Sequence, residues 1–453
     1  MSHTIAAIST GLTVSAIGIL RLSGENCIDI AGKVFTLNNG TSLSQAPDRK
    51  LVLGNLRDKN GRVIDQCMAV CSRAPHSYTG EDTVEFHCHG SPAVLTAGLE
   101  ALYAAGAKPA GRGEFTKRAF LNGKLALTQA EAVIDLIEAE TADAAANAAG
   151  QVSGVLQRKL QPVYQELVDL CSHFHAVLDY PDEDIEDFGL EQYENTLRTN
   201  AKVLYALLQT YGQGRILKQG VSAAIVGKPN VGKSSLLNAL AGYERVIVTE
   251  VAGTTRDTVE ETVMLGSTRL RLIDTAGIRE TEDKIEAMGI ARSRQAVENA
   301  DLTIFVCDGS IPLTQEDHAI MQLCCEKENA IALINKRDLG RKVYPSDLPF
   351  MNIIEVCTTT GQGLDQLADL VDQLFAGNTP CDGSILTNAR QYDAVRRAFE
   401  AMARALDGLK MGLTPDAVLT DVEDAMISMG EVTGGTVRED ITARIFERFC
   451  VGK

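Results

Sequence analysis

The sequence contains no tryptophan and no long apolar run. Aromatic residues make up only 5% of its 453 residues, and no segment approaches the ~20 consecutive apolar residues that a membrane-spanning helix needs. We therefore expect a protein that does not cross a bilayer. The 45% hydrophobic content is that of globular domains, and since a single core stops growing near ~250 to 300 residues, we expect two or three of them.

The sequence also lacks a basic leader and a C-x-x-C pair. Residues 1–24 carry no basic residue before their apolar ones and have Arg21 after them, a pattern that indicates a strand rather than a signal peptide. Without export, we expect a reducing cytoplasm. The 11 cysteines are scattered and odd in number, which argues against a complete disulfide set. We interpret most of them as small buried apolar residues.

Basic residues are scarce. The chain has 43 Lys and Arg against 60 Asp and Glu, for a net charge of −17. Phosphate contacts need Lys and Arg and dominate affinity for nucleic acids. An excess of acidic residues is therefore unfavourable for a chain that binds nucleic acid without a partner. If RNA is the substrate, a local basic patch or a basic partner must do much of the binding.

The hydrophobic pattern changes three times along the chain. Residues 1–118 combine short β-rich runs with one helical stretch, which predicts an α+β domain. Residues 119–218 have helical periodicity, with Thr128 and Glu131 at the spacing of a capping box. Residues 219–377 alternate apolar strands and helices, as in a parallel α/β domain. Because helical pattern returns over 378–453, we predict a multidomain fold in which the α/β domain is inserted into a discontinuous helical domain.

The segment GKPNVGKS, residues 227–234, matches G-x-x-x-x-G-K-[ST] between an apolar strand and a helical stretch. Glycines let backbone N–H groups surround phosphates, Lys233 can reach the terminal phosphates, and the Ser234 hydroxyl can bind Mg²⁺. In this context the pattern favours a nucleotide-binding P-loop over a plain glycine turn.

Two further motifs follow in the order typical of a GTPase. In DTAG, after a strand, Asp274 can hold Mg²⁺ through water and the Gly277 N–H can sense the terminal phosphate. In NKRD, Asp338 can accept two hydrogen bonds from guanine, whereas adenine leaves the carboxylate unpaired, a mismatch that supports discrimination on the order of 10⁴. Together the motifs predict GTP.

The candidate GTP-binding residues lie in five segments. They are Asn230, Val231, Gly232, Lys233, Ser234 and Ser235; Thr249, Glu250, Val251, Ala252, Gly253, Thr254 and Thr255; Asp274, Thr275, Ala276 and Gly277; Asn335, Lys336 and Asp338; and Cys357, Thr358 and Thr359.

The residue after DTAG is Ile278, where Ras-like enzymes have the Gln that orients the attacking water. Hydrolysis is therefore slow, or another group positions the water. The Asn230 side chain, with backbone oxygens of the first switch loop at 249–258, could hold a monovalent cation that replaces the charge of an arginine finger. Asn230 as a simple turn former stays open as the alternative.

The chain resembles the MnmE (TrmE) family of tRNA-modification GTPases. The resemblance rests on GKPNVGKSS, VAGTTRD, DTAGIRE, NKRD and the terminal FCVGK, and on the N-terminal GILRLSG, SYTGEDTVEFHCHG and GEFTKRAFLNGKLALTQAEAVIDLI. It covers essentially the whole chain. The GTPase motifs occur in many relatives, whereas the ending and the GEFTKRAFLNGK block are far more specific.

The resemblance implies a K⁺-stimulated GTPase whose G domains meet across a homodimer. It implies that K⁺ is bound by Asn230, Thr249, Val251 and Thr254, and Mg²⁺ by Ser234 and Thr255. Glu286 matches the water-orienting glutamate, a candidate catalytic residue, although by itself it reads as an ordinary acid on a helix surface. Where relatives have SAK or SAR in the last base-contacting loop, this chain has Cys357, Thr358 and Thr359.

The resemblance also implies a folate site in the N-terminal domain, for 5-formyltetrahydrofolate or a related folate. Matching residues are Arg21, Glu85, Lys124 and Lys453. A carboxylate suits the amino-pyrimidine edge of a pterin, and cations suit the glutamate tail. Cys450 becomes a candidate catalytic thiol that the final helix delivers to this pocket, with Gly452 permitting the bend. A prenylation signal is a poor match, since it favours an aliphatic residue where Gly452 stands.

The triplet HCH at 87–89 raises the possibility of a metal site. On a strand, His87 and His89 share one face and Cys88 points to the other, so the three cannot converge locally. We therefore expect no metal centre from this triplet alone.

We consider three hypotheses for the function of the protein. The leading hypothesis is a GTPase that acts with tRNA and a flavin-dependent MnmG/GidA-type partner, in a heterotetramer or larger complex. Together they install a carboxymethylaminomethyl or aminomethyl-type group at carbon 5 of the wobble uridine. The second is a regulatory or ribosome-assembly switch, which predicts an appended RNA-binding module or basic tail that the sequence does not display. The third is a folate enzyme that GTP regulates.

Overall fold

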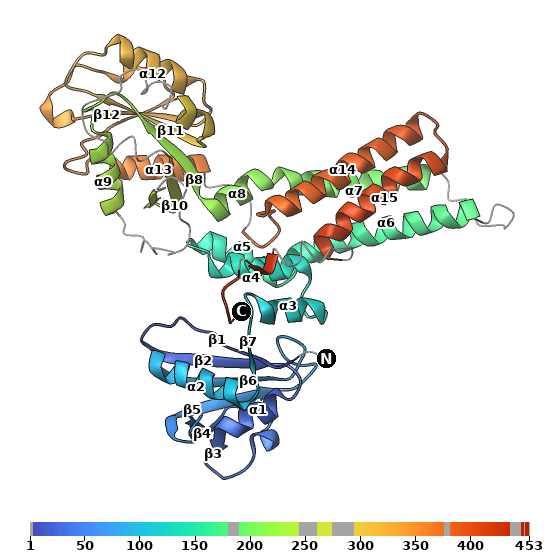
Figure 1. Ribbon diagram of the computed structural model, residues 1–453. Helices are drawn as coiled ribbons and strands as arrows, with labels where there is room; N and C mark the ends of the chain where they lie inside the picture. Colours follow the sequence, from blue (N-terminus) through green and yellow to red (C-terminus); the bar gives the residue numbers. More distant parts are fainter. Residues whose placement is uncertain are drawn as a thin grey trace.

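The computed structural model describes residues 3–179, 190–243, 261–273, 294–375, 381–434, 445–447 and 449–452. Figure 1 shows a sheet-containing N-terminal domain, an elongated layer of helices and a second sheet-containing domain beyond one end of that layer. The predicted multidomain fold is therefore confirmed. The boundaries after residues 118, 218 and 377 stay predictions.

The N-terminal domain is a seven-stranded sheet with two helices on one face. The strand order is β3-β4-β5-β6-β2-β1-β7, antiparallel except for β1 and β7. Its core lies between the sheet and helices α1 and α2. The strand predicted near the N-terminus is present as β1 and β2. The elements are β1 (Ile5–Ile8), β2 (Ser15–Ser23), α1 (Cys27–Val34), β3 (Phe35–Leu37), η1 (Leu43–Gln45), β4 (Val52–Arg57), β5 (Val63–Ser72), β6 (Thr83–Gly90), α2 (Pro92–Ala105) and β7 (Lys108–Pro109).

The helical domain is built from two separate parts of the chain. Helices α6, α7, α14 and α15 pack into a long bundle around buried Leu, Ala, Val and Met side chains, and α4 and α5 lie at its base (Figure 1). This matches the predicted discontinuous helical domain. The helices are α3 (Glu114–Leu121), α4 (Leu127–Ile137), α5 (Ala142–Val152), α6 (Val155–Asp179), α7 (Leu190–Gln209), α8 (Tyr211–Gln219), α14 (Ala389–Lys410) and α15 (Pro415–Thr433).

The predicted capping box at Thr128 and Glu131 is wrong. Helix α4 begins at Leu127, and the Gln129 side chain accepts the hydrogen bond from the Ala126 N–H at 2.9 Å. Glu131 is buried and accepts two hydrogen bonds from Arg390, both at 2.8 Å, and one from Gln391 at 2.7 Å. Its carboxylate therefore ties α4 to α14 and joins the two parts of the helical domain.

The inserted α/β domain has a six-stranded sheet in the order β13-β12-β11-β8-β10-β9, parallel except for the β9–β10 hairpin. Strands β8, β11 and β12 are buried along their whole length, which explains their continuous apolar sequences. The elements are β8 (Val221–Val226), α9 (Lys233–Tyr243), β9 (Glu261–Leu265), β10 (Thr268–Ile273), β11 (Leu302–Asp308), α12 (Gln315–Cys325), β12 (Ala330–Asn335), η2 (Arg337–Leu339), η3 (Pro345–Asp347), β13 (Asn352–Glu355) and α13 (Leu364–Phe375).

All eleven cysteines carry free thiols, and most are buried, as predicted. Within the described ranges, no helix is both long and apolar enough to span a membrane.

Candidate functional site

The predicted P-loop, residues 227–234, is called the phosphate loop below. It connects β8 to α9 at the carboxyl edge of the parallel strands. Its glycines at 227 and 232 have φ of 153° and 102°. A Cβ at Gly232 would overlap the Asn335 amide nitrogen, and one at Gly227 would overlap the Val306 carbonyl. Only glycine fits both positions, and the loop ends at the N-terminus of α9, where backbone N–H groups and the helix dipole favour an anion.

Lys233 is held inside this loop. Its ammonium donates to the carbonyl oxygens of Gly227 and Lys228, both at 2.6 Å. Burial lowers the pKa of Lys233 from its ordinary value. Phosphate oxygens would be stronger acceptors than these carbonyls for the same ammonium.

Ser234 and Ser235 follow on the exposed first turn of α9. Mg²⁺ ligation by the Ser234 hydroxyl stays a prediction. Asn230 has φ 61°, the left-handed conformation that Asn tolerates, and its side chain is exposed. Asn230 therefore has a role in forming the turn, and its K⁺ ligation stays a prediction.

Asn335 joins the phosphate loop to the loop predicted to recognise the base. Its buried side chain donates to the Val231 carbonyl at 2.9 Å and accepts from the Thr358 N–H at 3.2 Å. Three segments that are far apart in sequence are thereby held at one edge of the sheet. A nucleotide whose phosphates lie on the first segment would place its base near the other two.

Lys336 adds a second connection. Its ammonium bonds the Asn230 carbonyl at 2.7 Å and the Asp308 carboxylate at 2.7 Å. Burial acts to raise the pKa of Asp308, but hydrogen bonds from Lys336 and Ser310 hold it below the ordinary value of 3.8. The carboxylate therefore stays ionised and keeps Lys336 against the phosphate loop.

Asp338, predicted to bind guanine, is exposed. The Cys357 thiol donates to it at 3.3 Å, and the Thr359 hydroxyl lies 3.1 Å from the same sulfur. The Cys-Thr-Thr sequence that departs from the family pattern therefore lies directly beside the carboxylate predicted to bind guanine.

Several predicted site residues lie outside the described residues. They are Thr249, Glu250, Val251, Ala252, Gly253, Thr254, Thr255, Asp274, Thr275, Ala276, Gly277, Glu286 and Lys453.

The C-terminal tail docks on the N-terminal domain. Phe446 and Phe449 are buried against helices α3 and α4 of the helical domain, and beyond them the Gly113 N–H donates to the Cys450 carbonyl at 3.3 Å. The Gly452 carbonyl accepts from the Ser9 hydroxyl at 2.9 Å and lies 3.5 Å from an Arg21 guanidinium nitrogen. Cys450 is exposed beside this docked backbone.

Two of the predicted folate residues face the tail. Arg21 and Glu85 are cross-strand neighbours on β2 and β6 and form an ion pair at 2.7 Å. The Arg21 guanidinium also lies over the rings of Tyr78 and Phe115, 5.9 and 5.6 Å from their centroids. Lys124 is exposed and lies beside Gly80 of the loop after β5, and no described contact joins it to Arg21 or Glu85.

Sequence reasoning missed Tyr78, Phe115 and Ser9 at this site. Aromatic and hydroxyl residues at those positions carry no local signal, because Tyr78 comes from the loop between β5 and β6, Phe115 from α3 and Ser9 from the end of β1, and only the tertiary fold gathers them around Arg21 and the tail.

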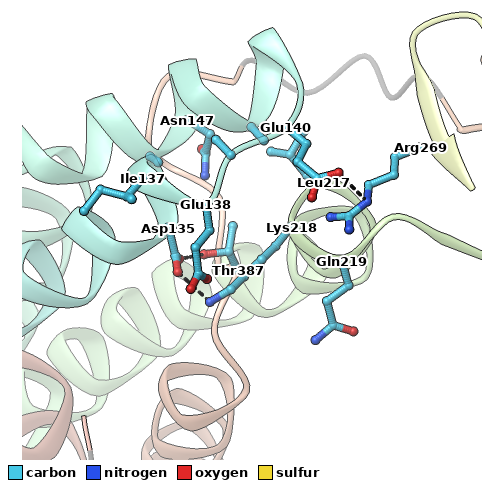
Figure 2. Close-up of a pocket in the computed structure, with 13 residues that line it drawn as sticks. Asp135, Ile137, Glu138, Glu140, Asn147, Leu217, Lys218, Gln219, Arg269 and Thr387 are labelled. Carbon is cyan, nitrogen blue, oxygen red and sulfur yellow. Dashed lines mark hydrogen bonds and ion pairs between the residues drawn. The ribbon is translucent and has the colours of Figure 1, made fainter. Parts of the chain in front are cut away.

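A cavity of about 610 Å³ lies where the α/β domain meets the helical domain (Figure 2). Two ion pairs cross it: Lys218 to Asp135 at 2.6 Å and Arg269 to Glu140 at 3.0 Å. Arg269 belongs to β10, which is paired with the strand that leads into the phosphate loop. Contacts between the two domains thus reach the sheet that carries the nucleotide site.

Comparisons with known proteins decide the family. A family model described as the MnmE helical domain matches residues 127–450, and one described as the GTP-binding protein TrmE N-terminus matches residues 4–124. A tRNA modification GTPase MnmE from Heliobacterium modesticaldum is 40% identical over 100% of both chains. The chain belongs to the MnmE family of tRNA modification GTPases.

Other MnmE proteins match over nearly the same length. The one from Alkaliphilus metalliredigens is 41% identical over 100% of both chains, and the one from Streptococcus suis is 41% identical over 99% of this chain and 98% of its own. Among solved structures, the G domain of the T. maritima FeoB iron transporter matches 35% of this chain and 99% of its own, at 25% identity and a TM-score of 0.26.

Proposed function

We propose that this MnmE-family chain hydrolyses GTP to drive modification of carbon 5 of the tRNA wobble uridine, together with a flavin-dependent MnmG/GidA-type partner. The observation that carries the nucleotide part is the Asn335 side chain, which bonds both the phosphate loop and the loop at Thr358. This side chain holds the segment proposed to bind the phosphates beside the loop proposed to bind the base.

In this proposal the chain's own residues bind and orient GTP. The Lys233 ammonium exchanges the Gly227 and Lys228 carbonyls for phosphate oxygens. The Asp338 carboxylate exchanges its contact with the Cys357 thiol for the two donors of guanine. Mg²⁺ at Ser234 and Thr255, and K⁺ at Asn230, Thr249, Val251 and Thr254, would supply positive charge to the phosphates. Glu286 would position the attacking water.

Besides the GTP site, we propose a second functional site where the C-terminal tail docks on the N-terminal domain. Arg21 and Glu85 present a cation and a carboxylate beside aromatic rings, and this combination suits the polar edge and the glutamate tail of 5-formyltetrahydrofolate or a related folate. Lys124 and Lys453 would add cations. We propose that the folate donates one carbon and that the Cys450 thiol works beside it.

A homodimer suits the open face of the N-terminal sheet. Helices α1 and α2 cover one face of this sheet. Apolar side chains near its other face are exposed, including Val14 at 88%, Ile17 at 58% and Leu53 at 45%. Packing against a second copy would remove these side chains from water. We propose that a second copy covers it.

One reconstitution tests the proposed function. Purified chain, the flavoprotein partner, tRNA, a folate and GTP are combined in a cytoplasm-like K⁺ buffer, with matched reactions in Na⁺, without GTP and without this chain. We expect modified wobble uridine only in the complete K⁺ reaction. Equal modification without this chain or without GTP hydrolysis would contradict the proposal, and equal GTP turnover in Na⁺ would contradict the K⁺ site.

A further inference from the structure

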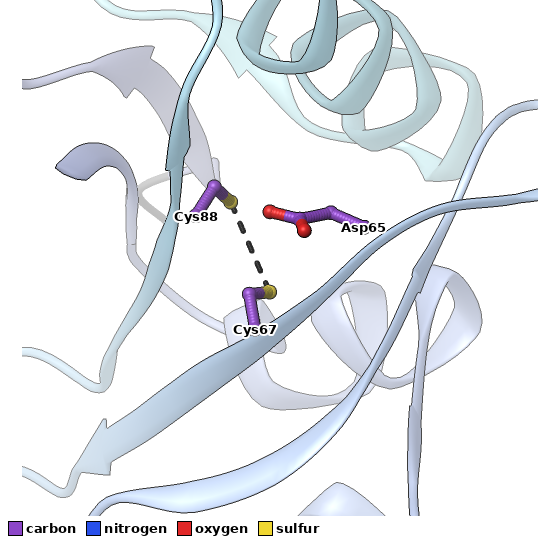
Figure 3. Close-up of side chains that lie close together, drawn as sticks. All are labelled: Asp65, Cys67 and Cys88. Atoms are coloured by element: carbon purple, nitrogen blue, oxygen red, sulfur yellow. Dashed lines mark hydrogen bonds between the residues drawn. The ribbon is translucent and has the colours of Figure 1, made fainter. Parts of the chain in front are cut away.

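Two buried cysteines face each other across β5 and β6 (Figure 3). The register pairs Met68 with His87, which sets Cys67 opposite Cys88, and their sulfurs lie 3.9 Å apart. Asp65 lies two residues before Cys67 on β5, so its side chain shares that face of the sheet. One ligand atom from each of the three residues lies within 4.8 Å of the other two.

The 3.9 Å distance between the Cys67 and Cys88 sulfurs matches the spacing of two ligands on one metal ion. Two sulfurs that are each ~2.3 Å from a tetrahedral Zn²⁺ lie roughly 3.8 Å apart, and a carboxylate oxygen at ~2.0 to 2.2 Å completes a third ligand position. Directly opposed residues on neighbouring strands fix the two sulfurs at that spacing without any loop movement. A single ion could therefore bind with small rotations of the three side chains.

The carboxylate is already oriented. Asp65 is buried and accepts hydrogen bonds from the His89 N–H at 2.8 Å and from the His89 ring at 2.7 Å. Among the described residues, no Lys or Arg forms an ion pair with Asp65. A hydrogen-bonding partner that fixes a ligand in this way is usual around protein metal sites.

Both thiols are buried among the apolar side chains of the domain core. A divalent cation would supply the positive charge that stabilises two thiolates and a carboxylate, and its binding would release protons.

We propose that Asp65, Cys67 and Cys88 bind one thiophilic divalent cation, Zn²⁺, with water at the fourth position. The site lies on the face of β6 that packs toward α1 and α2, opposite Glu85 and His87. It is thus separate from both the tail site and the nucleotide site. The ion would hold β5 against β6, the strand that also carries Glu85 on its other face.

Cobalt binding tests the proposal on the full, reduced chain. After chelation and buffer exchange, Co²⁺ is titrated in while the near-ultraviolet thiolate-to-cobalt band is recorded, and Zn²⁺ is then added as competitor. We expect one Co²⁺ per chain, displaced by Zn²⁺. Cys67→Ser and Cys88→Ser should weaken binding on the order of 100-fold, and Asp65→Asn at least ~10-fold. Cys71→Ser, a matched change of a buried cysteine on the same strand, should bind like the parent.

X-ray absorption of the Zn²⁺-loaded parent protein does not depend on whether the variants fold. We expect two sulfurs at ~2.3 Å and the remaining ligands at oxygen distances. The proposal is overturned if the parent binds no stoichiometric ion, if the absorption spectrum contains no sulfur, or if Cys71→Ser loses binding as much as Cys67→Ser does. A Cys67–Cys88 disulfide in the reduced, metal-treated protein would also overturn it.

Discussion

Replacing Gly452 with alanine is expected to release the C-terminal tail from the N-terminal domain. Gly452 has φ 100°, in the left-handed region. An added Cβ would overlap the Ile8 carbonyl and lie 3.0 Å from the Ser9 Cα, so the backbone must move away from β1. The carbonyl that accepts from the Ser9 hydroxyl would move with it.

The expected change in the free energy of tail docking is the sum of two costs. A non-glycine residue in the left-handed conformation costs about 1–2 kcal/mol, and the lost hydrogen bond contributes about 1 kcal/mol. Together they destabilise docking by roughly 2–3 kcal/mol, which lowers the docking equilibrium constant on the order of 30- to 150-fold. Phe446 and Phe449 stay packed against α3 and α4 of the helical domain, so only the residues after Phe449 are expected to be released.

Hydrogen exchange and tRNA modification measure this release. The Gly113 N–H, which donates to the Cys450 carbonyl, should exchange faster, and modification should fall while GTP hydrolysis is unchanged. Gly412→Ala is the matched control, because Gly412 has φ 76° but nothing within 4 Å of an added Cβ. Unchanged exchange and unchanged modification in Gly412→Ala and Gly452→Ala alike would refute the reasoning.

Three further predictions concern the two other domains. Glu131→Gln should lower the free energy of unfolding by about 3 kcal/mol in urea titrations, since it leaves the half-buried Arg390 without its anion, whereas the exposed Glu138→Gln should change it little. Asp338→Asn should weaken GTP binding by on the order of 10⁴ and favour xanthosine triphosphate, because an amide can donate to the second carbonyl of xanthine; equal GTP affinity in a competition assay would contradict it. The pKa of Asp308 is lowered in the folded state, so its contribution to stability is present at neutral pH and is lost as pH falls below about 3.8; Asp308→Asn should remove that part of the acid limb in a pH series of urea unfolding.

The fold was largely predictable because its patterns are local. Continuous apolar strands between helices predicted the α/β domain, and the glycine and lysine spacing of the phosphate loop predicted a turn whose φ values only glycine adopts. Helical periodicity on both sides of that domain predicted its insertion into a discontinuous helical domain.

The features that were not predictable depend on residues far apart in the chain. Glu131 fits a capping box by spacing alone, but its partners Arg390 and Gln391 come from the far side of the inserted domain. Cys88 was correctly expected to point away from His87 and His89, yet its neighbour Cys67 belongs to another strand, and only the register of β5 with β6 brings them together.

The central claim is that the GTP site and the tail site have separate roles. Its most direct test is Cys450→Ser, assayed in parallel for GTP hydrolysis and for tRNA modification in the reconstituted system. The exposed thiol lies on the docked tail, in a different domain from the phosphate loop. We predict K⁺-dependent GTP hydrolysis within about 2-fold of the parent and loss of wobble-uridine modification by at least about 100-fold, equivalent to roughly 3 kcal/mol. Modification at the parent level in this variant would contradict the account.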